Sequence, residues 1–145
     1  MDENYKSHNK INEEVEANML RNDTPVEQRP PIWVGHISLN VSDFTKSLQF
    51  FLLLGMQKVA LFPGGAVLEL RGGTHLVLNK RFNNTSGKAE FDLMVEDLKT
   101  QRSLLQEAGY SPTPIKKGML HSTFEVTEPS GNILKFFDTH VVGPV

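Results

Sequence analysis

Between residues 33 and 41, apolar and polar side chains alternate along the chain: Ile37, Leu39 and Val41 are separated by His36, Ser38 and Asn40. A period of two predicts a strand with one buried face. Apolar residues then recur at helical spacing from Phe44 to Leu52, after an N-cap at Ser42 or Asp43. Gly55 is placed to end this helix.

Three short strand-like segments follow the helix, at residues 57–62, 66–70 and 74–80. The glycine-rich stretches at 63–65 and 72–73 favour tight turns between them. The predicted unit is therefore a strand, a helix and three further strands.

The same unit occurs a second time. Val41 to Phe44 is echoed by Val95 to Leu98, and Gly55 by Gly109, both 54 positions later. Towards the end of the units, residues 73–78 align with residues 131–136, which are 58 positions later. A single such unit leaves one sheet face uncovered, whereas two units side by side can enclose a shared concave surface. The sequence predicts an α+β domain over residues 32–145, with module one at 32–82, module two at 83–145 and a cavity-enclosing mixed sheet.

The alternation also assigns side chains to the two faces of each sheet. One face is uniformly apolar and must lie under the helices: Ile37, Leu39, Val41, Phe91, Leu93, Val95, Phe124, Val126, Leu134 and Phe136. The other face carries too many polar groups for a packed core. A small polar ligand needs a polar cavity of this kind. The candidate ligand-binding residues are His36, Ser38, Asn40, Asp92, His121, Thr123, Glu125 and Lys135.

Residues 1–31 form a polar N-terminal arm that ends in Arg29-Pro30-Pro31. Ile11, Val15 and Met19 recur at four-residue spacing, which gives one side of a short helix an apolar stripe. The arm is either a flexible tail or an element docked on the domain or on another subunit, since so short a helix is marginal alone. The docked alternative favours a homodimer.

Composition narrows the functional classes. Among 145 residues, 15 are Lys or Arg, 17 are Asp or Glu, and none is Cys. This balance argues against nucleic-acid binding, and the lack of cysteine excludes disulfides and thiolate metal sites. The longest apolar run, from Phe50 to Leu54, is far shorter than the ~20 residues that span a bilayer. The first residues lack the features of a signal peptide, so we expect a cytoplasmic protein without membrane contact.

Three stretches of the sequence resemble the vicinal oxygen chelate superfamily, which includes glyoxalase I, bleomycin-resistance proteins and extradiol dioxygenases. They are residues 35–43, residues 47–55 and Phe124-Glu125-Val126-Thr127-Glu128-Pro129-Ser130-Gly131-Asn132, which is similar to the turn before the family's last strand. The resemblance implies the paired-module fold. It leaves enzymatic activity open, because the superfamily contains both enzymes and proteins that only bind a ligand.

In the metal-dependent members, ligands come from the first and last strands of each module. The corresponding first-strand residues here are His36 and Glu90, which fit a ligand role. The last-strand positions hold Val77 and Lys135, which depart from the family's usual Glu and cannot bind a cation in the same way. A rearranged metal site would use His36 and Glu90 with Glu69, or with His75, as a further ligand.

Two functions follow as expectations. The first is a small-molecule-binding protein of the glyoxalase/bleomycin-resistance type, with its ligand in the polar cavity and no cofactor. The alternative is an enzyme, a lyase, isomerase or dioxygenase, that uses one divalent metal ion, with Glu90 as the catalytic residue that moves a proton. Lys135 either pairs with Glu90 or Glu125 or contacts an anionic ligand, and His36 is either a hydrogen-bonded core histidine or a ligand contact.

Overall fold

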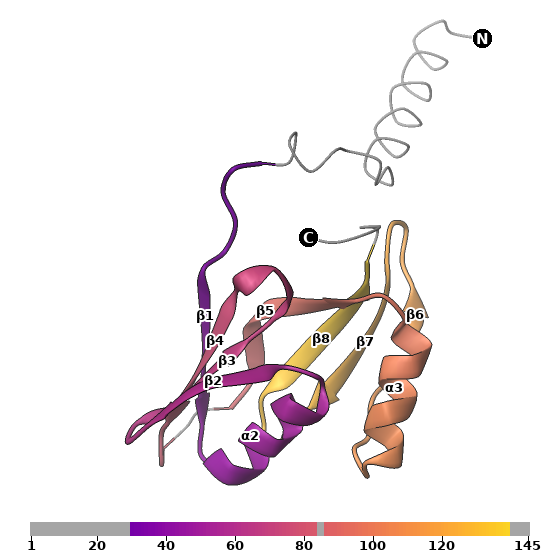
Figure 1. Cartoon of the computed structure of the whole chain (residues 1–145). Coiled ribbons are helices and arrows are strands. Elements are labelled where there is room, and N and C mark those ends of the chain that lie inside the picture. The colour runs from indigo at the N-terminus through magenta and orange to yellow at the C-terminus, as the bar shows by residue number, and fades with distance from the viewer. Residues whose placement is uncertain (1–29, 84–85, 140–145) are drawn as a thin grey trace, which may run out of the picture.

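The computed structural model describes residues 30–83 and 86–139, so the predicted arm lies outside the described residues except for its last two positions. Figure 1 shows the elements. Module one contains β1 (His36–Val41), α2 (Phe44–Leu53), β2 (Gln57–Phe62), β3 (Gly65–Glu69), the 3-10 turn η2 (Arg71–Gly73) and β4 (His75–Lys80). Module two contains β5 (Lys88–Val95), α3 (Leu98–Glu107), β6 (Lys116–Lys117), β7 (Ser122–Thr127) and β8 (Ile133–Asp138).

The two modules have the same strand order. One four-stranded sheet runs β1-β4-β3-β2 and the other runs β5-β8-β7-β6. In each module the first strand pairs in parallel with the last, and the other pairs are antiparallel. The predicted α+β fold of two repeated units is therefore confirmed, with the strands divided between two separate sheets.

Matching residues begin and end the two helices. Asp43 and Asp97 are the N-caps, and each side chain accepts a hydrogen bond from the backbone N–H three residues later. Gly55 and Gly109 follow the helices with φ of 103° and 94°, a left-handed conformation that favours glycine. Each pair is separated by 54 positions, so the alignment of the two units predicted from the sequence is confirmed.

Two strands differ from the sequence prediction. The strand predicted over residues 33–41 begins at His36, and Trp33 and Val34 before it are 70% and 58% exposed. Among the described residues they pair with no strand, because β4 begins only at His75. The two-residue strand β6 was not predicted; it is too short to show a period and is held by pairing with β7.

The apolar faces of both sheets and the helices contribute to one hydrophobic cluster. All ten side chains predicted for the apolar faces belong to it, seven of them buried and three partly buried. Phe50 and Phe51 of α2 and Leu105 of α3 are fully buried in the same cluster. Each such side chain contributes about 1.5–3 kcal/mol when it leaves water. The core therefore lies between helices and sheets and leaves the opposite sheet faces free.

A buried polar network joins the two modules. It connects α2 of module one to the turn between β7 and β8 of module two, and the lower ends of these two paired strands lie next to α2 in Figure 1. The carboxylate of Glu128 accepts hydrogen bonds from the Ser47 hydroxyl, the backbone N–H groups of Ser130 and Asn132, and the Asn132 side chain. The Asn132 amide also donates to the carbonyl of Asn40 at 2.9 Å. The turn that resembles the family's motif thus acts as a joint between the modules.

A second, exposed contact links the modules at another place. The Arg71 guanidinium lies 2.8 Å from Glu96, and both side chains are more than half exposed. Exposed ion pairs of this kind contribute about 1 kcal/mol at most. No helix in the described part of the chain is long and apolar enough to cross a membrane.

Candidate functional site

The polar faces of the two sheets carry the candidate residues. On β1, His36, Ser38 and Asn40 are exposed, and on β5 Glu90 and Asp92 are exposed as well. His121, Thr123, Glu125 and Lys135 on or beside β7 and β8 are half-buried. The division into a polar and an apolar face follows the sequence prediction at every one of these positions. The exposure of both first strands means that a single chain leaves this face open to solvent instead of enclosing it.

A row of ionisable side chains crosses module one at the start of β1. His36 is the register partner of His75 on β4, and His75 is the partner of Glu69 on β3. The two imidazole rings meet edge to face with centroids 5.4 Å apart, and His75 Nε2 lies 3.4 Å from Glu69 Oε1. Each histidine is the first residue of its strand, and the register of β1 and β4, rather than a sequence pattern, brings the two together.

A second charged row crosses module two. Lys135 on β8 is the register partner of Asp92 on β5 and of Glu125 on β7. Among the ion pairs of the described residues none involves Lys135, and its Nζ instead lies 5.4 Å from the centroid of the Phe137 ring. The predicted ion pair with Glu90 or Glu125 is therefore absent from this part of the chain, because the side chain leans along its own strand.

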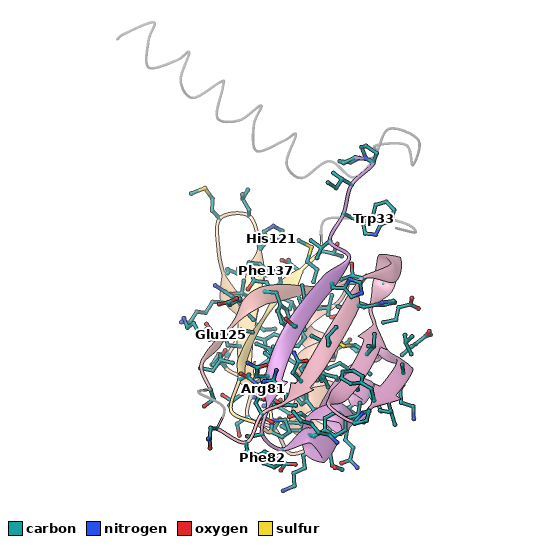
Figure 2. All side chains as sticks on the ribbon, turned by 90° about the vertical axis from the view of Figure 1, so that its left-hand side faces the viewer. Trp33, Arg81, Phe82, His121, Glu125 and Phe137 are labelled. Carbon is teal, nitrogen blue, oxygen red and sulfur yellow. The ribbon has the colours of Figure 1, made fainter. Side chains whose placement is uncertain are left out.

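His121 lies beside the same aromatic ring. Its Nδ1 is 2.9 Å from the backbone carbonyl of Asp138 and 3.4 Å from that residue's carboxylate, and its ring meets Phe137 edge to face at 5.4 Å. Figure 2 shows His121 and Phe137 in the upper half of the molecule and Arg81 and Phe82 near its lower end. His121, Phe137 and Lys135 together form one cluster on the polar face of module two.

The metal ligands predicted from the resemblance are not brought together. His36 and Glu90 belong to the first strands of the two modules, as the resemblance implies, but the last-strand positions hold Val77, which has no donor atom, and Lys135. Within residues 30–83 and 86–139, no three His, Asp or Glu side chains converge closely enough to hold a metal ion. The set His36, Glu90 and Glu69 therefore does not fit a metal in this arrangement, and Glu90 as a catalytic residue stays a prediction.

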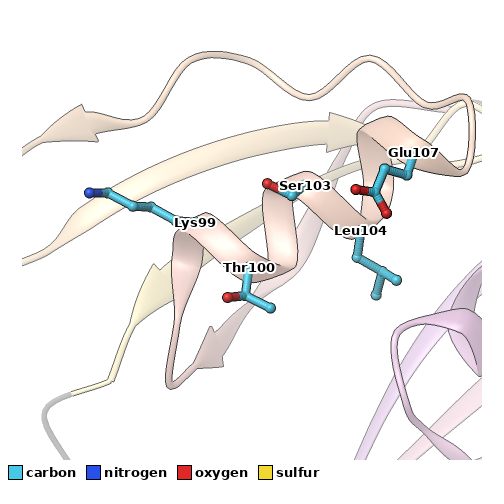
Figure 3. A pocket seen from close by; sticks show the side chains of 5 residues that line it. All are labelled: Lys99, Thr100, Ser103, Leu104 and Glu107. Carbon is cyan, nitrogen blue, oxygen red and sulfur yellow. The ribbon is translucent and has the colours of Figure 1, made fainter.

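A shallow hollow of about 340 Å³ lies elsewhere, on the outer face of α3 (Figure 3). It is lined by five residues of that one helix: Lys99, Thr100, Ser103, Leu104 and Glu107. A single helix offers no opposing wall, so this hollow lacks the enclosure of a typical ligand site. It contains none of the candidate residues.

Comparison with known proteins identifies the fold. No family model matches the sequence, and no curated protein does. A lactoylglutathione lyase from Agrobacterium tumefaciens has a similar structure, with TM-score 0.64 and 15% identity over 80% of this chain and 100% of its own. An antibiotic-binding protein from Streptomyces sp. CB03234 gives TM-score 0.62 and 23% identity over 76% of this chain and 98% of its own.

A third solved structure is described by its superfamily. It is a member of the glyoxalase/bleomycin resistance protein/dioxygenase superfamily from Sphaerobacter thermophilus, with TM-score 0.62 and 21% identity over 74% of this chain and 98% of its own. These matches agree with the strand order and the repeated modules. The chain therefore has the fold of the vicinal oxygen chelate superfamily.

Proposed function

We propose that this protein binds a small molecule on the polar faces of its two sheets, as a binding protein of the glyoxalase/bleomycin-resistance type. The observation that carries the proposal is the separation of faces: the core uses the apolar faces, and the polar faces are exposed on β1 and β5 and half-buried on β7 and β8. The proposed contacts are His36, Ser38, Asn40, Asp92, His121, Thr123, Glu125 and Lys135.

The solved structures with this fold support a small ligand in general terms. One is named as an antibiotic-binding protein and another as a lactoylglutathione lyase, and both names refer to small molecules. The metal-dependent alternative has less support, since no three His, Asp or Glu side chains of the described residues converge on a metal position, and the last-strand positions hold Val77 and Lys135. Cytoplasmic location stays a prediction from the sequence.

A second copy of the chain is part of the proposal. The polar face is open in one chain, whereas ligand sites bury most of their ligand. A homodimer in which a second chain covers this face would supply the missing wall. Sedimentation of the full chain should therefore give the mass of two chains, and removal of residues 1–31 should weaken the dimer if the arm is docked. A monomer at all concentrations would contradict this part of the proposal.

The ligand-binding proposal is tested by nuclear magnetic resonance. A library of small polar and aromatic fragments is added to ¹⁵N-labelled full-length protein, and amide shifts are followed. We expect the shifts to cluster on polar-face residues such as Ser38, Asp92 and Thr123. The matched control is Thr100, which lies in the hollow on α3. Shifts confined to α3, or the absence of any fragment that binds, would overturn the proposal.

A further inference from the structure

The polar face of module two carries two large apolar side chains that the core does not use. Met94 on β5 is 55% exposed, and its register partner on the adjacent strand β8 is Phe137, which is half-buried. Register partners on neighbouring strands point to the same side of the sheet. Neither residue belongs to the hydrophobic core. Met94 and Phe137 therefore form an apolar wall on a face that is otherwise mostly polar.

Polar groups lie directly beside this apolar wall. Thr123 on β7 is the register partner of Phe137, and Lys116 on the edge strand β6 is the partner of Thr123. The Lys135 ammonium reaches the wall along β8, since its Nζ lies 5.4 Å from the centre of the Phe137 ring. His121 meets the same ring edge to face, as Figure 2 shows. The apolar wall thus borders on a hydroxyl and two lysine side chains.

The Lys135 ammonium has no counter-ion within the described part of the chain. Its register partners Asp92 and Glu125 are carboxylates, yet none of the ion pairs involves Lys135. The ammonium points instead toward Phe137, whose row lies about 7 Å farther along the sheet. A half-buried ammonium that loses its remaining water without gaining an acceptor is costly. A molecule that covers this part of the face therefore binds best if it supplies a negatively charged acceptor.

We propose that this part of the polar face binds an aromatic carboxylate. The ring of the ligand packs against Met94 and Phe137, and its carboxylate accepts hydrogen bonds from the Lys135 ammonium and the Thr123 hydroxyl. This choice of ligand class rests on the proposed function of the polar face. A neutral ring leaves the ammonium without a charged partner, a cation is repelled by it, and a carboxylate without a ring does not use the apolar wall.

A negative charge of the protein lies close to the proposed position of the ligand carboxylate. Glu125 is the register partner of Lys135 and stands one row from Phe137, and Figure 2 shows it below Phe137. Because like charges repel, Glu125 lowers the affinity for a carboxylate. If Lys135 paired with Glu125 when a ligand binds, Glu125 would instead support the binding of a neutral molecule. Glu125→Gln removes the charge and keeps a hydrogen-bonding side chain, so its effect has opposite signs in the two cases.

The test is a titration of ¹⁵N-labelled full-length protein with naphthoate and with its neutral amide, naphthamide. Neutral pH keeps the carboxylate ionised, the ionic strength is held constant, and amide shifts give both dissociation constants. We expect naphthoate to bind about tenfold more tightly than naphthamide, since hydrogen bonds between charged partners are the stronger ones. The shifts should centre on Thr123 and Phe137.

Three variants separate the two halves of the ligand. Lys135→Met should weaken naphthoate about tenfold, to the level of naphthamide, and leave naphthamide nearly unchanged; it breaks no ion pair, so we expect it to fold. Met94→Ala, at an exposed position, should weaken both ligands by a similar factor of about threefold. Glu125→Gln should strengthen naphthoate binding about twofold.

The matched control is Lys117→Met. It removes the same charge from β6, at a position whose partner Ser122 is on the opposite face from Thr123, so naphthoate binding should change by less than about twofold. Thermal melts show that all variants are folded.

Four results would overturn the proposal: equal affinity for naphthoate and naphthamide, no change of their ratio in Lys135→Met, an equal loss in Lys117→Met, or weaker naphthoate binding in Glu125→Gln. If library fragments bind the polar face and naphthoate does not, the choice of aromatic carboxylates fails while the proposed function stands. If no fragment binds there either, both fail.

Discussion

The buried joint between the modules gives a sharp stability prediction. Glu128 is 2% exposed, and its two carboxylate oxygens accept four hydrogen bonds. Three of the donors come from the turn between β7 and β8, and the fourth is the hydroxyl of Ser47 on α2. Replacement by alanine removes the acceptor for all four at once and leaves a small cavity.

The expected loss follows from the number of donors. A buried donor without a partner costs about 1–3 kcal/mol. Four donors at the low end give about 4 kcal/mol, and alanine also removes the cost of burying a carboxylate, so we expect a loss of about 3–4 kcal/mol for Glu128→Ala. Glu128→Gln should cost only about 1–2 kcal/mol. Its amide oxygen keeps the three turn donors and its amide nitrogen donates to Ser47, whose hydroxyl then turns to Ser130, 2.6 Å away.

Urea unfolding followed by circular dichroism measures both losses. Fluorescence is less suitable, because the chain has one tryptophan and Trp33 is 70% exposed. Glu107→Ala, on the exposed surface of α3, is the control for removing a carboxylate and should be nearly neutral. The reasoning is refuted if Glu128→Ala costs less than about 1 kcal/mol, or if the glutamine variant loses as much as the alanine variant.

Three further predictions concern single residues. Gly65→Ala should lower the free energy of unfolding by about 2–3 kcal/mol or more in the same assay, because its Cβ would lie 1.7 Å from a backbone carbonyl of β4; Gly35→Ala, with open space, should not. Hydrogen bonds from the Thr100 backbone and hydroxyl hold the pKa of Asp97 below its usual value. Its stabilising effect is therefore present above that value and lost as pH falls through the lowered pKa, and Asp97→Asn should flatten this part of a pH–melting curve. Lys135→Met should change the free energy of unfolding by less than about 1 kcal/mol, since no ion pair is broken.

The fold could be predicted from the sequence because its signals are local and repeated. A period of two in the apolar residues predicted which face of β1, β5, β7 and β8 is buried. Aspartate and glycine at matching positions predicted where both helices begin and end. The buried role of Glu128 had no such signal. A glutamate before Pro129 in a turn is normally solvated, and only the packing of α2 against the turn shows that it is buried.

The candidate site was predicted as a set of residues but not as a geometry. The two-residue period of a strand predicts which face of the sheet a side chain is on. It does not predict which residues of neighbouring strands lie opposite each other. The pairing of His36 with His75 depends on the register of β1 and β4, which a single sequence does not specify. The position of His36 relative to Glu90 depends in turn on how the two modules join, through contacts more than 80 positions apart in sequence.

The Glu128 network and the Arg71–Glu96 ion pair, which link the modules, use none of the candidate side chains of the polar faces, so stability and binding should respond to different residues. Leu134 is fully buried, so Leu134→Ala should cost about 2–5 kcal/mol. Asp92 and Thr123 lie on the polar face of the same sheet and do not belong to the hydrophobic core, so Asp92→Ala and Thr123→Ala should stay within about 0.5 kcal/mol of the unaltered protein. The same two variants should weaken fragment binding at the polar face. If they destabilise the chain as much as Leu134→Ala does, the polar face is part of the structural core and not a surface kept for a ligand.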